Sequence, residues 1–266
     1  AAHPEAWILG EVIHGDYPAF AAASTAHSIT QYELWKAIWS SLADHNLFEL
    51  AHALGRHQEF LEAEGGAHPL TFVGNHDTTR IASQLPDGRD LAAAIALLAL
   101  LPGIPAVYAG DEFGATGVKE ERAGGDDAIR PWFPGSPDEV VAAAGSAQSA
   151  PGGPDHLTLL KAEAAERILE VHRRLFSLRR REPWLAAATV EVDEGSLENT
   201  WVQITLTPRA EDAAAKGPLT LVLNLGDEER PAPGEVLEAV SGADMLDGVG
   251  PAAPGAVPAH GAAVVR

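Results

Sequence analysis

The sequence predicts an α/β fold followed by a smaller β-rich domain, and three observations support this prediction. Short runs of strand-forming residues alternate with amphipathic helical segments over residues 1–185. Several of these runs end in polar and acidic residues, and the carboxyl ends of parallel strands are where α/β proteins present ligand-binding side chains. Over residues 186–266, alternating and β-branched segments replace the helices. We therefore predict two domains that meet at residues 185–186.

The first region contains four predicted strand–helix units. Their strands are centred on Leu9, Ile29, Phe72 and Val107. Apolar residues recur every three or four positions in the segments that follow, which predicts helices at residues 33–42, 48–61, 91–101 and from about 157 to 182. The intervening segments 13–28 and 110–155 are expected to be loops, and the half of the second loop that contains Lys119 and Arg130 is expected to be functional.

The second region contains three predicted strands of an antiparallel β domain, at residues 189–192, 200–207 and 219–225. Apolar residues alternate with polar ones along them, so one face of each strand is expected to pack against a core. Pro and Gly in the intervening segments are typical of turns between strands.

The composition excludes several classes of function. With 18 basic and 38 acidic residues the chain has a formal net charge of −20, which argues against a nucleic-acid partner. No apolar run is long enough to span a membrane, so no membrane partner is expected. The absence of cysteine excludes disulfides and thiolate chemistry. The alternative explanation for the negative charge is that the acidic residues form a surface that favours solubility.

Acidic side chains follow three of the predicted strands. Glu11 ends the first strand, Asp77 follows the third, and Asp111 and Glu112 follow the fourth. Because the carboxyl ends of parallel strands meet at one edge of a sheet, these carboxylates are expected to converge. Carboxylates that share a site push their pKa values apart, so that one donates a proton while another stays ionised. Cleavage of a glycosidic bond requires this division of roles.

Polar and aromatic residues close to these acids are candidate substrate-binding groups. His14 and Tyr17 follow Glu11, and Asn75, His76 and Arg80 surround Asp77. Aromatic side chains such as Tyr17 and Trp132 offer flat faces for sugar rings.

Each of these groups also has a purely structural explanation. Glu11 could lie in a surface turn, and Asn75-His76-Asp77 could form an Asx-type turn that opens a helix. Asp111 and Glu112 could form a salt bridge with Lys119 or Arg122, and Trp132 could be a packing residue.

A metal site is a rival explanation for the histidines, because eight of the eleven lie before residue 80. His45, Glu49 and His52 fall on one face of a predicted helix. However, the chain has no His-Glu-x-x-His run, and the spacing from His52 to His57 does not place both on one helix face. We therefore expect neither a metal ion nor another cofactor.

Three segments together resemble the conserved regions of the alpha-amylase family, glycoside hydrolase family 13. Phe72-Val73-Gly74-Asn75-His76-Asp77 resembles the fourth region, residues 7–12 resemble the third region on the fifth barrel strand, and residues 103–112 resemble the eighth strand. Their order and spacing also agree. The resemblance extends from Trp7 to about Leu185, and it implies that the first domain holds strands five to eight of a (β/α)8 TIM barrel, followed by a C-terminal β-sandwich.

The resemblance also implies a reaction and the roles of individual residues. The reaction would be retaining cleavage or transfer at an α-glucosidic bond of an α-glucan or a related oligosaccharide. Glu11 would be the general acid/base. Asp77 would bind sugar hydroxyls and stabilise the transition state, and His76 would contact the same sugar.

The nucleophile of the family has no counterpart in this sequence. In the family it is an Asp on the fourth strand, two residues after an essential Arg, and no such run occurs here. The first conserved region, which carries an Asn-His pair, is absent as well. Since a retaining glycosidase needs two carboxylates roughly 5 Å apart, we expect little hydrolysis by this chain alone. The sequence lacks an initiator Met, so its natural start is expected upstream, in a missing N-terminal half-barrel.

Two other functions remain open. The chain could be a non-catalytic module that binds a sugar or a protein partner. It could also be one half of a split enzyme that a separate chain with strands one to four completes. The sequence does not distinguish hydrolysis from transfer or isomerisation.

Overall fold

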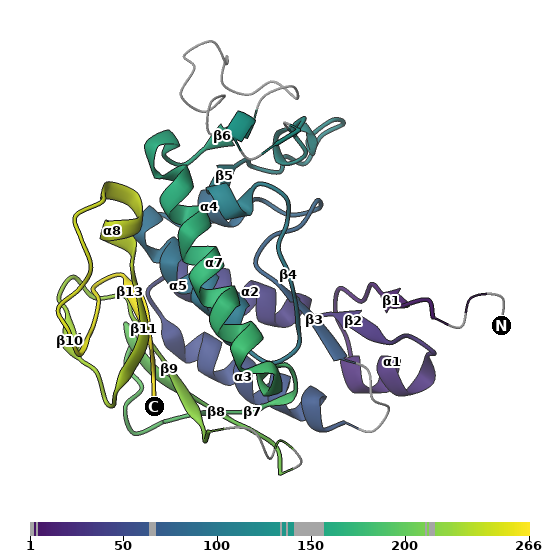
Figure 1. Ribbon diagram of the computed structural model, residues 1–266. Helices are drawn as coiled ribbons and strands as arrows, with labels where there is room; N and C mark the ends of the chain where they lie inside the picture. Colours follow the sequence, from purple (N-terminus) through teal and green to yellow (C-terminus); the bar gives the residue numbers. More distant parts are fainter. Residues whose placement is uncertain are drawn as a thin grey trace.

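A parallel sheet and an antiparallel sheet lie at opposite ends of the molecule (Figure 1). The computed structural model describes residues 3, 5–63, 68–133, 135–136, 138–140, 157–210, 212 and 216–266. Helix α5 (Leu91–Leu100) lies between the two sheets and contacts both, and α7 (Ala165–Arg181) packs against α5. The structure therefore confirms the predicted α/β class of the first region and the antiparallel strands of the second.

The first region is built on a four-stranded parallel sheet. Its strands follow the order of the sequence: β1 (Leu9–Gly10), β2 (Ser28–Thr30), β3 (His68–Phe72) and β4 (Ile104–Ala106). Gly10 lies opposite Ile29, and Phe72 lies opposite Ala106. Because all neighbouring pairs are parallel, the four carboxyl ends lie at the same edge of the sheet. β1 and β4 are its edge strands.

Helices connect these strands, and most of them match the predicted ranges. The helices are α1 (Tyr17–Ala23), α2 (Tyr32–Ala43), α3 (Leu47–Glu62), α4 (Ile81–Gln84) and α5. α1 contradicts the predicted loop at 13–28: Asp16 accepts a hydrogen bond from the Ala19 N–H at 3.0 Å and caps the helix, and Pro18 stands in its first turn. In the described part of the chain, no helix is long and apolar enough to cross a lipid bilayer.

Helix α5 is buried on all sides. All ten of its residues are buried, which explains a segment that is apolar throughout instead of along one stripe. The helix contacts α2 and α7 as well as β9, β11 and β13 of the antiparallel sheet. One hydrophobic core is therefore continuous from the α/β region to that sheet.

Helix α7 begins later than the sequence predicts. Residues 158–159 form β6 (Thr158–Leu159), which pairs antiparallel with β5 (Ala115–Thr116), and the Leu160 N–H donates to the Gly114 carbonyl at 2.8 Å. A short 3-10 turn, η4 (Ala162–Ala164), follows before α7 begins. Pairing with a distant strand thus replaces the first turns of the predicted helix. Much of the predicted loop at 110–155, including 141–156, lies outside the described residues.

The C-terminal region contains a five-stranded antiparallel sheet. Its order is β11 (Val236–Ser241), β13 (Gly261–Val265), β9 (Leu219–Asn224), β8 (Trp201–Thr207) and β7 (Thr189–Val192). The three predicted strands correspond to β7, β8 and β9. The sequence did not predict β11, β13, the helix α8 (Gly242–Asp247), or the two-stranded ribbon of β10 (Arg230–Pro231) and β12 (Ala256–Val257).

Side chains of this sheet alternate between two apolar clusters. Val202, Ile204 and Val264 join the core around α5, whereas Trp201 and Ala263 join a smaller cluster that includes Val257 of β12. The layer on the outer face is thus a two-stranded ribbon. The predicted domain boundary at 185–186 falls within the 3-10 helix η5 (Pro183–Ala187), and the division into two domains stays a prediction.

Candidate active site

A cavity opens against the parallel sheet, at the carboxyl ends of its strands. Its volume is about 360 Å³, and its lining consists of Leu9, Glu11, Thr30, Tyr32, Leu70, Phe72, Gly74, Asn75, His76, Ala106, Val107 and Tyr108. Three of the predicted site residues, Glu11, Asn75 and His76, therefore surround one space. Apolar side chains of β1, β3 and β4 or their ends form much of its wall.

Tyr32 connects Glu11 with Asn75. Its hydroxyl donates a hydrogen bond to Glu11 Oε1 at 3.0 Å and accepts one from Asn75 Nδ2 at 2.9 Å. Burial and the hydrogen bond to Glu11 raise the pKa of Tyr32 to about 12, so the phenol stays protonated at neutral pH. The hydroxyl proton is therefore available to fix the orientation of the Glu11 carboxylate.

Tyr32 is a site residue that the sequence pattern does not single out. The pattern predicts it at the end of a strand, whereas it is the first residue of α2 and is 7% exposed. The sequence contains a signal for it, because Tyr32 comes shortly after β2, as Glu11 comes shortly after β1 and Asn75 after β3. The rule that polar side chains at strand ends converge applies to it equally.

Asn75 shapes the turn that carries His76 and Asp77. Its Oδ1 accepts a hydrogen bond from the Asp77 N–H at 2.9 Å, and its own N–H donates to Thr78 Oγ1 at 3.3 Å. This is the Asx-type turn that the sequence offered as a structural explanation. The same turn directs Asn75 Nδ2 toward Tyr32, so Asn75 has both a local role and a contact in the cavity.

Two cations from the loop after β4 hold Asp77. Arg130 forms an ion pair with the Asp77 carboxylate, and its Nε donates to the His76 carbonyl at 2.6 Å. Lys119 Nζ donates to the Asp77 carbonyl at 3.0 Å. His76 Nε2 lies 3.2 Å from Asp77 Oδ2. The half of the loop that the sequence predicted to be functional thus contacts the His76-Asp77 pair.

Arg80, a candidate substrate-binding residue from the sequence, is buried in the structure. Its side chain is 1% exposed, and its Nη1 lies 2.7 Å from Asp111 Oδ1. It also donates to the carbonyls of Ala109 and Ile129 at 3.0 Å each, and its guanidinium lies over the Tyr108 ring. The Arg80 side chain is long enough to extend beneath the strand ends. In this position it supports the loop after β4, and it does not face a ligand.

Asp111 is the buried partner of Arg80, so its ion pair is not with Lys119 or Arg122, as the structural alternative suggested. Burial raises the pKa of the Asp111 carboxyl to about 7, although the Arg80 guanidinium acts in the opposite direction. The carboxylate also packs against Gly74, where any Cβ atom would collide with it. Glycine at position 74 is therefore required for this close approach.

The remaining predicted residues lie beside the cavity. His14 and Tyr17 line a neighbouring hollow of about 600 Å³, to which Tyr32 also contributes. His14 is exposed, whereas Tyr17 is 4% exposed and its hydroxyl donates to the Ile13 carbonyl at 3.1 Å. Trp132 is 78% exposed, which contradicts the alternative that it is a packing residue.

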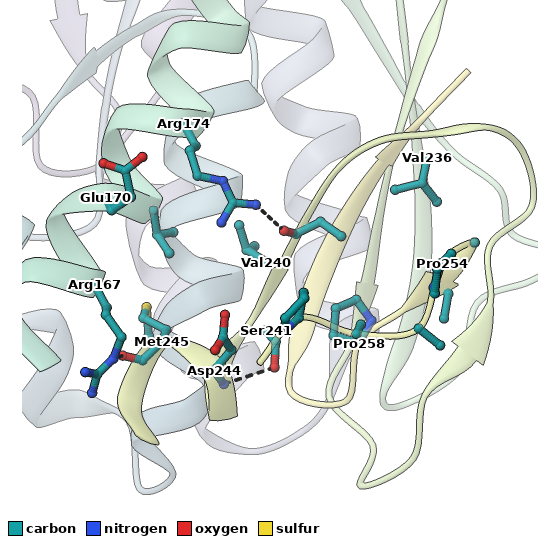
Figure 2. Close-up of a pocket in the computed structure, with 17 residues that line it drawn as sticks. Arg167, Glu170, Arg174, Val236, Val240, Ser241, Asp244, Met245, Pro254 and Pro258 are labelled. Atoms are coloured by element: carbon teal, nitrogen blue, oxygen red, sulfur yellow. Dashed lines mark hydrogen bonds between the residues drawn. The ribbon is translucent and has the colours of Figure 1, made fainter. Parts of the chain in front are cut away.

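A further cavity of about 370 Å³ lies between α7 and the C-terminal elements (Figure 2). Arg174 forms an ion pair with Glu238, and it donates to the Ala239 carbonyl at 2.7 Å. Arg167 donates to the carbonyls of Met245 and Leu246. Both guanidinium groups therefore attach α7 to the segment of β11 and α8, and we assign these arginines a packing role.

Solved structures of several carbohydrate-active enzymes share this fold. The alpha-amylase from H. orenii is 20% identical with a TM-score of 0.66, and the match covers 97% of this chain and 52% of that chain. The cyclic alpha-maltosyl-(1→6)-maltose hydrolase from Arthrobacter globiformis is 19% identical with a TM-score of 0.62, and the match covers 97% of this chain and 48% of that chain. The trehalulose synthase from Pseudomonas mesoacidophila is 16% identical with a TM-score of 0.67, and the match covers 99% of this chain and 56% of that chain. At these identities the likeness concerns the fold, and the chain spans about half the length of these structures.

Comparison with protein families gives a match over the N-terminal half. Residues 1–143 match the family model described as alpha amylase, catalytic domain. A comparison with curated proteins found no match. Because the family model covers more than half of the 266 residues, the chain belongs to the alpha-amylase catalytic-domain family.

Proposed function

We propose that this chain forms strands five to eight of the catalytic (β/α)8 barrel, and the following β domain, of a retaining enzyme that hydrolyses or transfers α-glucosidic bonds. Its substrate would be an α-glucan or a related oligosaccharide. The observation that carries the proposal is the placement of Glu11, which faces the same cavity as Asn75 and His76 and accepts a hydrogen bond from Tyr32 at 3.0 Å. A fixed carboxyl at the carboxyl end of a barrel strand is suited to proton transfer.

Glu11 would act as the general acid/base. The Tyr32 hydroxyl occupies Oε1, and Oε2 would exchange the proton with the glycosidic oxygen. In the first step the acid protonates the leaving oxygen, and in the second step its conjugate base activates water or an acceptor sugar. Tyr32 itself would position Glu11 without exchanging a proton, because its pKa of about 12 keeps it protonated.

Asp77 and His76 would bind the sugar beside the bond that breaks. Arg130 holds the Asp77 carboxylate from the side of the loop, and Lys119 fixes the backbone below it. A carboxylate held in this way is preorganised to accept hydrogen bonds from sugar hydroxyls and to stabilise an oxocarbenium-like transition state.

The exposed apolar face of the sheet supports the half-barrel part of the proposal. Trp7, Ile8, Leu9 and Val107 lie on or beside the edge strands β1 and β4 and are 40–55% exposed. Closure by four more strands would cover such residues and pair both free edges. The nucleophile would then come from a strand outside this chain, and the catalytic centre would form only when both halves are together.

The test compares an enzyme that carries all eight strands with the 266-residue chain alone, on maltooligosaccharides and an aryl α-glucoside. We expect the complete enzyme to lose about 10²–10⁴-fold in kcat in the Glu11→Gln variant. Glu59→Gln, at an exposed position on α3, is the matched control and should leave kcat unchanged. If the chain alone turns over substrate and Glu11→Gln abolishes this activity, the proposal that the nucleophile lies outside this chain is refuted.

Sugar binding without cleavage is the alternative function. It is favoured by one observation: among the described residues that line the cavity, Glu11 is the only carboxylate. This alternative predicts saturable binding of a maltooligosaccharide to the chain, weakened in His76→Ala, with no cleavage by any form of the protein. A split enzyme instead predicts that activity returns when a separate chain with strands one to four is added.

A further inference from the structure

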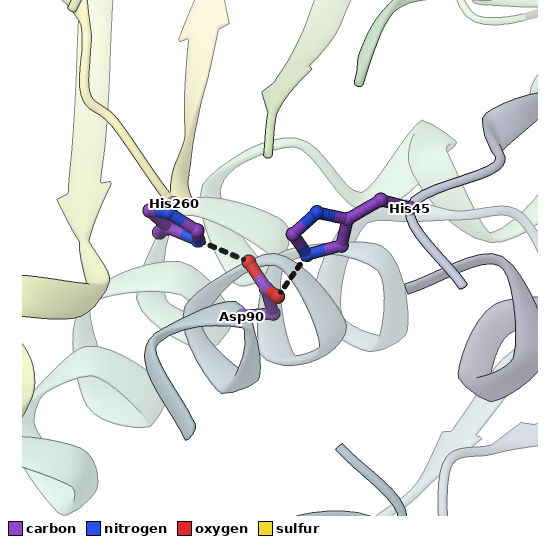
Figure 3. A group of neighbouring side chains, drawn as sticks. All are labelled: His45, Asp90 and His260. Atoms are coloured by element: carbon purple, nitrogen blue, oxygen red, sulfur yellow. Dashed lines mark hydrogen bonds and ion pairs between the residues drawn. The ribbon is translucent and has the colours of Figure 1, made fainter. Parts of the chain in front are cut away.

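Three residues outside the candidate active site form a separate cluster, His45, Asp90 and His260 (Figure 3). His45 lies in the turn between α2 and α3, Asp90 directly precedes α5, and His260 directly precedes β13. His45 Nε2 is 2.8 Å from Asp90 Oδ2, and His260 Nδ1 is 2.8 Å from Asp90 Oδ1. Two imidazole rings from distant segments therefore converge on one carboxylate.

The carboxylate at the centre of this cluster is buried. Asp90 is 1% exposed, and although it stands at the start of α5 its side chain makes no capping hydrogen bond to the helix. Its hydrogen-bond partners among the described residues are the two imidazoles. A buried carboxylate needs positive charge or strong donors to offset its lost hydration, so the interaction with the two rings is what keeps it stable.

The surroundings of the cluster carry excess negative charge. His260 Nδ1 lies 3.8 Å from Asp87 Oδ2, and Arg89 pairs with both Asp87 and Asp227. With neutral imidazoles, the three carboxylates and one guanidinium sum to about −2. A divalent cation would neutralise this group.

The second nitrogen of His260 has a partner that is typical of metal-binding histidines. Its Nε2 lies 3.0 Å from Asp227 Oδ1. Histidines that bind a metal through one nitrogen commonly donate the other N–H to a carboxylate, which fixes the tautomer and the ring orientation. With the ion bound, the proton would lie on Nε2, and the lone pair of Nδ1 would face the ion beside Asp90 and His45. The His45 side chain is 36% exposed, so an ion and a water molecule can reach the cluster from that side.

We propose that His45, Asp90 and His260 bind a divalent first-row transition-metal ion, for which Zn²⁺ has the best-matched ligand chemistry. Two imidazole nitrogens and one carboxylate, with water completing the coordination, suit zinc, whereas Ca²⁺ and Mg²⁺ prefer oxygen ligands alone. Metal–ligand bonds of roughly 2.0–2.2 Å fit the cluster with Asp90 bound through both oxygens, or after the rings move apart by about 0.5 Å. The ion would join the α2–α3 turn and the start of α5 to the C-terminal sheet.

This site differs from the helix-face arrangement that the spacing of the histidines suggests. That arrangement paired His45 with Glu49 and His52. In the structure His45 precedes α3 instead of lying within it, Glu49 contacts Lys36 and Ser40, and His52 is exposed. The partners of His45 are Asp90 and His260, which follow it by 45 and 215 positions in the chain. No rule based on local spacing could indicate such a site.

The test is a calorimetric titration of the chelator-treated protein with Zn²⁺ at neutral pH. We expect one site with a micromolar or lower Kd, and an increase in Tm of about 5 °C or more at a hundredfold excess of Zn²⁺ over Kd. His45→Gln should weaken binding at least tenfold, and Asp227→Asn, which alters only the partner of His260, should weaken it several-fold or more. His52→Gln, on the exposed face of α3, should bind as the unmodified protein does.

Two outcomes would overturn the proposal. One is the absence of saturable Zn²⁺ binding in the micromolar range, in which case the cluster is a hydrogen-bonded His–Asp–His contact only. The other is binding that persists unchanged in His45→Gln, which would assign it to other histidines. His45 is the primary position for substitution because it is partly exposed, so its replacement is compatible with folding. Circular dichroism of each variant verifies this.

Discussion

Replacement of Arg80 by Met is predicted to destabilise the protein strongly, because it leaves a buried charge without its partner. Both members of the Arg80–Asp111 pair are almost fully buried, at 1% and 3% exposure, and the Nη1–Oδ1 distance is 2.7 Å. Arg80 also donates to the carbonyls of Ala109 and Ile129. Met retains much of the volume of the Arg side chain and removes the charge and all three hydrogen bonds.

The magnitude follows from what remains after the change. Breaking a buried ion pair by removing one partner typically costs about 3–5 kcal/mol, since the other charge stays buried. Burial raises the pKa of Asp111 to about 7 even beside Arg80, and Arg80→Met removes the charge that lowers this pKa. The variant carboxyl can therefore be protonated, and protonation costs less at acidic pH. We therefore expect Arg80→Met to lose about 3–5 kcal/mol of unfolding free energy at pH 8 and less at pH 5.

Urea unfolding at the two pH values is the assay, and Arg56→Met is the control. Arg56 forms an ion pair with Glu33, but its side chain is 48% exposed, so its removal should cost about 0–1 kcal/mol. A loss below about 1 kcal/mol in Arg80→Met at pH 8, equal to that of the control, would refute the reasoning. The double variant Arg80→Met, Asp111→Leu should recover part of the loss, because no charge is then left buried.

Three other predictions concern the core, the pH dependence and the candidate site. Leu97→Ala, at a buried position of α5, should lower the unfolding free energy by about 2–5 kcal/mol in urea titrations, and a loss under about 1 kcal/mol would contradict a close-packed α5. Burial lowers the pKa of His57 to about 4, so below about pH 6.5 the unfolded chain binds a proton at His57 that the folded protein does not. The unfolding free energy should therefore fall by roughly 3 kcal/mol between pH 6.5 and 4. His57→Gln should make the unfolding free energy less dependent on pH in this range, as measured by urea unfolding. Arg130→Met should lower kcat of the complete enzyme about tenfold or more with little change in Tm, since Arg130 is 43% exposed, whereas Arg122→Met in the same loop should change neither.

The period of the apolar residues predicted the helices and strands that bury one face along their whole length. Helices α2 and α3 and strands β7, β8 and β9 were predicted within one or two residues, because their apolar positions follow one period from end to end. Helix α5, which is apolar throughout, was predicted equally closely as an uninterrupted apolar run. The helix α1 was missed although Asp16 and Pro18 form a helix start, because its seven residues are too few to show a helical period. The late start of α7 depends on pairing with residues 114–116, which no local pattern reveals.

The candidate site was predictable to the extent that strand ends determine it. Glu11, Asn75 and His76 line one cavity because parallel strands bring their carboxyl ends to one edge. The sequence does not show which way a side chain points once the strand has ended. Arg80 turns into the interior and Tyr32 turns toward Glu11, and only the fold decides between these directions.

The position of β13 determines when the antiparallel sheet can be completed. β13 comes after every other strand in the sequence, yet it lies between β11 and β9, and it helps to cover α5. During synthesis, an entirely apolar helix therefore leaves the ribosome long before the strands that shield it from water. Until β13 arrives, β11 has no neighbour in the sheet and α5 remains accessible to other chains. Removal of β13 would therefore divide the sheet in its interior instead of shortening it at an edge.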